Sequence, residues 1–266
     1  MSAISKTARP VRANQGLRLR YQAQMLALIE EMNASVLHWL AAQYNDAPPA
    51  ILADDALPSR EMQKRMRELA ARWIKRFDKA APKIAEAYLQ GQFKATDSAM
   101  MMALRDAGFA VKFTMTAGMR DALAASLDEN VGLIRSIPQQ YLQQVEGIVS
   151  RAFANGQGLD VMVKRLQALY PKARGRAALI ARDQANKANA VIVRARQMEL
   201  GITEAMWIHS NGGKTPRPSH VKAGAERRRY KIAEGCLIDG EYIQPGELIN
   251  CRCVSRPILP GLTPSA

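Results

Sequence analysis

The chain has 266 residues, of which 48% are hydrophobic and 23% charged, a balance typical of folded globular proteins and not of disordered chains. Its 38 Lys and Arg residues outnumber its 24 Asp and Glu residues, which gives a net charge of +14. This excess attracts polyanions such as nucleic acid, or an acidic protein surface. No apolar run approaches the roughly 18 residues that a membrane span needs, and residues 1–10 show no apolar core of a secretion signal.

The first two predicted helices carry apolar side chains at helical spacing. One runs from about Leu17 to Tyr44, and the second carries a continuous apolar stripe from Met62 to Tyr88. A basic stripe follows another face of the second helix, either as a solvated surface or as a contact with phosphates or an acidic partner. Because proline cannot donate a backbone hydrogen bond, Pro82 predicts a kink or an interruption near the end of this helix.

Proline and glycine also set the expected boundaries further along the chain. A helix starting at Thr96 should end at Gly108, and Pro138 in a favoured first-turn position predicts the start of another. Pro171 predicts a break before a long helix over residues 173–200, which Gly201 should end. Together these patterns predict a helical body over residues 21–171.

The remaining chain differs in character at both ends. Residues 1–20 contain five basic residues and no acidic one, which predicts a separate basic arm. After Gly201, glycines and prolines separate short apolar runs such as MWIH and LINCRCV, a pattern typical of strands and turns. We therefore expect an α+β protein, with a mostly helical N-terminal body followed by a small strand-and-turn C-terminal module over residues 172–266.

All three cysteines and one histidine fall in this module, at His220, Cys236, Cys251 and Cys253. Cys251 and Cys253 are two residues apart, so on an extended backbone their side chains project to the same side. Four such ligands predict a tetrahedral structural zinc site. Two alternatives stay open: buried reduced thiols with His220 in a hydrogen-bond network, or one disulfide with a free thiol left over.

Catalytic signatures are absent from the sequence, which contains no Gly-rich phosphate loop, no GxSxG and no HExxH. An enzyme would need Arg217, His220 and an acid such as Glu247 to converge in a cleft. A zinc-containing nucleic-acid-binding protein is a further alternative, although no helix carries a recognisable base-reading motif.

Two stretches of the module carry a resemblance to a known family. The sequence resembles the C-terminal domain of the phage Mu F-like minor head proteins at WIHSNGGKTPRPSH over residues 207–220 and at PGELINCRC over residues 245–253. The upstream segment LIARDQANKAN over residues 179–189 also resembles the helix that precedes this motif in the family. These are head morphogenesis proteins of tailed bacteriophages. The resemblance covers about residues 140–258.

The resemblance implies a virion protein that is bound inside the head near the portal vertex and is assembled in the host cytoplasm. The implied roles are head morphogenesis and DNA packaging or ejection. The implied partners are the portal protein, other head or ejection proteins, and double-stranded DNA without sequence preference. It implies no enzyme activity and no required cofactor, whereas an alternative of the transferase or toxin type would use the Arg/His cluster. The residues that match the family pattern are Arg182, Trp207, Arg217, His220, Asn250, Cys251, Arg252 and Cys253. We expect them to form one packed, hydrogen-bonded cluster.

Overall fold

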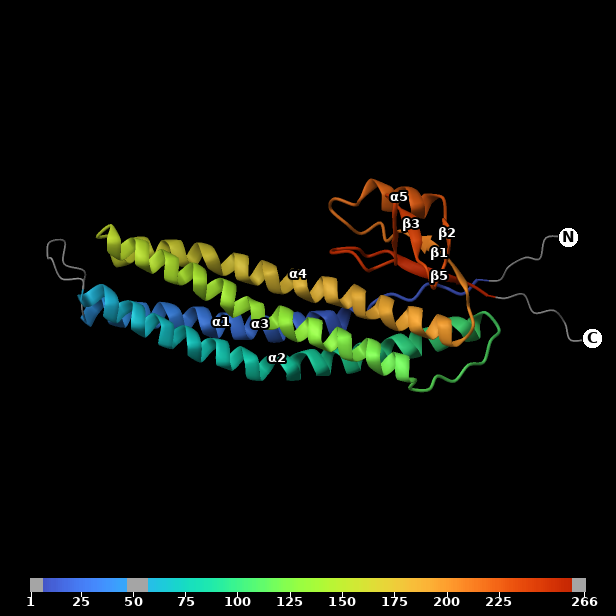
Figure 1. The fold of residues 1–266 in the computed structure, drawn as a ribbon, viewed down its shortest axis with the longest axis horizontal. Helices are drawn as coiled ribbons and strands as arrows, with labels where there is room; N and C mark the ends of the chain where they lie inside the picture. The colour runs from blue at the N-terminus through green and yellow to red at the C-terminus, as the bar shows by residue number, and fades with distance from the viewer. Residues whose placement is uncertain (1–6, 47–56, 260–266) are drawn as a thin grey trace, which may run out of the picture. The chain divides into compact units, whose positions relative to one another are not determined.

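The computed structural model describes residues 7–46 and 57–259, which contain five helices and five strands (Figure 1). The helices are α1 (Gln15–Asp46), α2 (Leu57–Asp106), α3 (Ala117–Ala154), α4 (Leu159–Glu199) and α5 (Pro218–Ala225). The strands are β1 (Glu204–Ile208), β2 (Arg229–Lys231), β3 (Cys236–Ile238), β4 (Glu241–Ile243) and β5 (Val254–Ile258). The predicted α+β class is confirmed. None of the described helices is long and apolar enough to cross a membrane.

The chain divides into two compact units, and each is built from segments that are distant in sequence. The helical unit comprises Leu19–Glu86 and Asp128–Ala181. The C-terminal unit comprises the described parts of Met1–Arg18, Ala87–Leu127 and Arg182–Ala266. These bounds differ from the sequence-based division at residues 20 and 171, because α2, α3 and α4 each contribute one segment to both units.

The helical unit buries the apolar stripes that the sequence predicted. Its core includes Met25, Ile29, Met32 and Leu40 of α1, Met66, Trp73 and Phe77 of α2, Ile134 and Val145 of α3, and Met162 and Leu166 of α4. Hydrogen bonds between helices supplement this packing: Tyr21 Oη donates to Asn130 Oδ1 at 2.8 Å, and Trp73 Nε1 donates to Ser35 Oγ at 3.1 Å. The basic stripe of α2 is exposed.

Two predicted helix boundaries at prolines were wrong, since α3 and α4 continue through Pro138 and Pro171. At Pro82, where a kink or an interruption was expected, α2 is not interrupted. An internal proline removes one helix hydrogen bond and costs about 3 kcal/mol. Apolar side chains are buried on both sides of each proline, and burying one such side chain contributes about 1.5–3 kcal/mol. The helix ends predicted at glycines were correct: Gly108 and Gly201 follow helix ends with positive φ angles.

The C-terminal unit contains a three-stranded antiparallel sheet in the order β2-β1-β5 and a β3-β4 hairpin. Its core combines apolar residues of α2 and α4 with residues of the sheet and the hairpin, among them Leu104, Val193, Trp207 and Ile243. The last part of α4 therefore packs against the strand-and-turn module.

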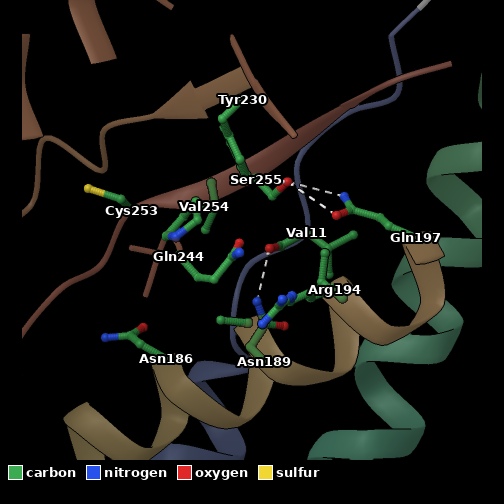
Figure 2. Close-up of a pocket in the computed structure, with 13 residues that line it drawn as sticks. Val11, Asn186, Asn189, Arg194, Gln197, Tyr230, Gln244, Cys253, Val254 and Ser255 are labelled. Carbon is green, nitrogen blue, oxygen red and sulfur yellow. Dashed lines mark hydrogen bonds between the residues drawn. The ribbon is translucent and has the colours of Figure 1, made fainter. Parts of the chain in front are cut away.

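Residues 7–18 also belong to this unit and do not form a separate arm. Thr7 pairs with Ile258, and Val11 is buried, with its carbonyl accepting a hydrogen bond of 3.0 Å from Asn189 Nδ2. Figure 2 shows this bond beside a small pocket in which the Gln197 amide points toward the Ser255 hydroxyl. The basic arm predicted for residues 1–20 is therefore corrected for residues 7–20, while residues 1–6 lie outside the described chain.

An arginine side chain is buried in this unit. Arg196 of α4 is 1% exposed and forms a two-pronged pair with Asp97 of α2, at 2.9 and 2.7 Å. It also donates to Glu199 Oε2 at 2.6 Å and to the Thr114 carbonyl. Phe93 and Phe113 lie 5.3 and 4.6 Å from its guanidinium carbon, so the cation is enclosed by aromatic rings as well as acids.

Candidate functional site

A buried aromatic pair positions the histidine of the candidate site. Trp207 of β1 is fully buried, and the His220 ring meets it edge-on at 5.0 Å between centroids and 85° between planes. His220 belongs to α5, which packs closely on the residue that follows β1. A Cβ at Gly224 would come within 2.4 Å of His209 Cβ and 2.9 Å of its backbone nitrogen, so only glycine fits there. This close approach brings His220 against Trp207.

A turn held by α4 positions the two neighbouring cysteines. Asn250 adopts a left-handed conformation with φ of 62°, and its backbone N–H donates to Asp183 Oδ1 at 2.7 Å. Arg182 Nη2 donates to Asn250 Oδ1 at 3.1 Å. Asparagine tolerates this backbone conformation better than most residues, which explains its place directly before the Cys251-Arg252-Cys253 segment.

The structure brings His220, Cys251 and Cys253 together in a buried cluster, which we call the Cys–His cluster. His220 Nδ1 lies 3.5 Å from Cys251 Sγ and 3.8 Å from Cys253 Sγ, and the three ligand atoms all lie within 4.8 Å of one another. The three side chains are each at most 4% exposed. The sequence-based expectation that this histidine lies beside the two cysteines is confirmed.

Cys236 lies outside the cluster, so the structure brings together three of the four residues that the sequence analysis grouped. Its side chain is fully buried at the start of β3, opposite Ile243 in the β3-β4 hairpin. In the hairpin, the Cys236 thiol is part of the apolar core, and this burial raises the pKa of Cys236. All three cysteines are buried and have free thiols in this structure.

The surroundings of the cluster shift the pKa values of its two cysteines. The pKa of Cys251 is lowered by its hydrogen bond with the Cys253 thiol, by backbone N–H groups including that of Gly246, and by His220. The pKa of Cys253 is raised because it supplies the proton of that bond and is buried, although the backbone of Ser210 and the indole N–H of Trp207 oppose this shift. The pKa values of the two thiols therefore shift in opposite directions, chiefly because of the interaction between them.

A cavity of about 580 Å³ opens beside the cluster, which we call the basic cavity. All three residues of the Cys–His cluster line it, together with four cationic side chains, Arg182, Lys214, Arg217 and Arg252. No aspartate or glutamate is among its lining residues, and none of the four cations pairs with an acid in the described chain. The cavity therefore offers a concentration of positive charge without neutralising carboxylates.

Hydrogen bonds fix two of these cations on the cavity wall. Arg217 Nη2 donates to the Ile249 carbonyl at 3.1 Å, and Arg252 Nη1 donates to the Gly212 carbonyl. Burial lowers the pKa of Arg252, and the neighbouring charges of Arg182 and Arg18 lower it further. Like charges thus lie close enough to repel one another, a cost that a bound anion would reduce.

The acid required by the enzyme alternative lies elsewhere. Glu247 Oε2 accepts a hydrogen bond of 2.6 Å from the Gln244 backbone and does not line the basic cavity. Arg217 and His220 both line it, so two of the three residues come together and the third does not. This arrangement lacks the carboxylate that a general acid or base mechanism with these residues would use.

Sequence reasoning missed two residues that link the site to α4. Asp183 anchors the Asn250 turn, and it stands next to the matched Arg182 in the sequence. Gly246, with φ of 90°, lies so close to α4 that a Cβ there would meet Ala190 Cβ at 3.0 Å. Their only sequence signal was their position within the segments 179–189 and 245–253, which carry the resemblance.

Residues 143–256 match the family model described as Phage Mu protein F like protein. This range agrees with the expected coverage of residues 140–258 and contains the whole Cys–His cluster and the whole basic cavity. A Haemophilus influenzae protein that bears the name "Uncharacterized protein" is 35% identical over 130 residues. That match covers 49% of this chain and 28% of the other protein. No solved structure matches the chain.

Proposed function

We propose that this chain, whose residues 143–256 form a Phage Mu protein F-like segment, is a minor head protein that acts in phage head morphogenesis. The observation that carries the proposal is the match itself, because it spans every residue of the site. The role is one of binding and assembly and not of catalysis, in keeping with a cavity that lacks a carboxylate.

Two finer features belong to the same proposal. The protein occupies the inside of the head near the portal vertex, where it contacts the portal protein and other head or ejection proteins. It also binds double-stranded DNA without sequence preference during packaging or ejection. The net charge of +14 and the four unpaired cations of the basic cavity support the contact with DNA phosphates.

The first test is where the protein lies in the virus particle. Particles of the phage that encodes the chain are purified, separated into heads and tails, and examined by mass spectrometry and localised reconstruction at the portal vertex. We expect the protein in the head fraction at low copy number. Its absence from particles, or its presence only in the distal tail, contradicts the proposal.

The second test measures DNA binding as a function of salt. We expect weak binding to unrelated duplexes with equal affinity, and a steep loss of affinity as salt rises because phosphate contacts release counterions. The double variant Lys214→Gln/Arg217→Gln removes two exposed cations of the basic cavity. If both contact phosphates, the slope of log affinity against log salt should fall by about two.

A matched double variant separates the cavity from overall charge. Lys112→Gln/Lys222→Gln removes the same charge from two exposed side chains that do not line the cavity. This control should change the salt slope much less than the cavity variant. Equal effects of the two variants would show that DNA binding is spread over the surface, and a sequence preference retained at high salt would overturn non-specific binding.

A further inference from the structure

We propose that His220, Cys251 and Cys253 form a three-ligand zinc site whose fourth coordination position faces the basic cavity. The site does not depend on the proposed function, since it rests on the side chains of the Cys–His cluster. It differs from the four-ligand site expected from the sequence in excluding Cys236. It also differs in kind, because three protein ligands leave one position for water or an anion.

The distances between the ligand atoms fit a tetrahedral zinc ion. Zinc bonds of about 2.3 Å to sulfur and 2.1 Å to nitrogen, at tetrahedral angles, separate a sulfur and a nitrogen ligand by roughly 3.6 Å. His220 Nδ1 lies 3.5 and 3.8 Å from the two sulfurs. Both separations are therefore close to those of a tetrahedral site, and all three ligand atoms lie within 4.8 Å of one another.

Backbone N–H groups point toward the two sulfurs, as they do where thiolates are stabilised. Gly246 N–H lies 3.4 Å from Cys251 Sγ, and the Ser210 backbone donates toward Cys253. A sulfur that binds zinc is deprotonated, and such donors stabilise its negative charge. The left-handed Asn250 and the Asp183 contact hold this turn in place before any metal binds.

The charges around the site also fit. Two thiolates and a neutral imidazole balance the charge of a zinc ion, so the occupied cluster is neutral overall. The four cations of the basic cavity favour the thiolate forms and favour a small anion or a polarised water at the fourth position. All three ligand residues line that cavity, so this position is open to solvent.

The test uses the full chain, produced in zinc-containing medium and purified without chelators under reducing conditions. Elemental analysis should find about one zinc per chain. Replacement by Co²⁺ should give the visible bands of tetrahedral cobalt and the near-ultraviolet bands of thiolate ligation. If the chain carries no zinc and cobalt titration gives no such bands, the site is overturned, and a Cys251–Cys253 disulfide found by mass spectrometry under the same conditions overturns it too.

Four single variants decide which residues bind the metal. Cys251→Ser, Cys253→Ser and His220→Ala should each lose most of the zinc, whereas the matched control Cys236→Ser should keep it. Circular dichroism identifies any variant that fails to fold, and cobalt spectra of the unaltered chain then report the number of thiolates independently. Loss of zinc from a folded Cys236→Ser protein overturns the three-ligand site in favour of a four-ligand one.

Discussion

Replacing Arg196 with Ala should destabilise the C-terminal unit by about 3–5 kcal/mol, the usual cost of removing one partner of a buried ion pair. Asp97 is 15% exposed at its side chain and would keep its charge without its two-pronged partner. The Thr114 carbonyl would lose its donor, and the space between Phe93 and Phe113 would be left open. Denaturant unfolding, with hydrogen exchange at the β1 and β5 amides, measures the change.

Two further variants separate the causes of this loss. Arg196→Met fills the space between the aromatic rings, and combining it with Asp97→Asn removes the stranded charge, so the double variant should recover part of the stability. The exposed pair between Arg135 and Asp78, at 3.1 Å and 44% exposure on each side, is the matched control. Arg135→Ala should cost at most about 1 kcal/mol. Equal losses for the two arginines would contradict a buried-charge mechanism.

Local patterns predicted the helices well because each position of an apolar stripe is repeated one turn later. Met25, Ile29 and Met32 are all buried in α1 as their spacing requires. The same local reasoning failed at Pro138 and Pro171, because it weighs the lost hydrogen bond and not the packing of the helix on both sides. Helix ends at glycine were predictable, since the left-handed conformation is a local property.

The cysteines and the histidine of the site could be grouped from the sequence because these residue types are rare in this chain. Its aspartate partners could not be identified, because acidic residues are common. Three cysteines and three histidines in the chain make the grouping of His220 with Cys251 and Cys253 an informative pattern. Rarity alone could not separate Cys236 from the others, because the hairpin register decides where its side chain lies. The partners Asp183 and Asp97 lie 67 and 99 positions from Asn250 and Arg196, and no spacing distinguishes them from other acids.

Replacing Trp207 with Ala should cost the C-terminal unit about 3–5 kcal/mol, as is typical when a large buried aromatic side chain is truncated. Trp207 is fully buried at the centre of the antiparallel sheet, and it supports the His220 ring edge-on. The variant should therefore loosen β1 and β5 and free the His220 ring to rotate. Hydrogen exchange of the β1 amides, together with denaturant unfolding, measures the first effect, and the His220 ring resonances in NMR spectra measure the second.

Trp207→Phe keeps an aromatic ring against His220 and should cost roughly 1–2 kcal/mol, because less volume is lost. Tyr242→Ala is the matched control, since that ring belongs to the same module but is 62% exposed, and its removal should change stability by at most about 0.5 kcal/mol. If Trp207→Ala and Tyr242→Ala lowered stability equally, the sheet would not depend on the buried ring. A Trp207→Ala protein that kept its stability but lost the order of the His220 ring would assign Trp207 to positioning the histidine and not to the core.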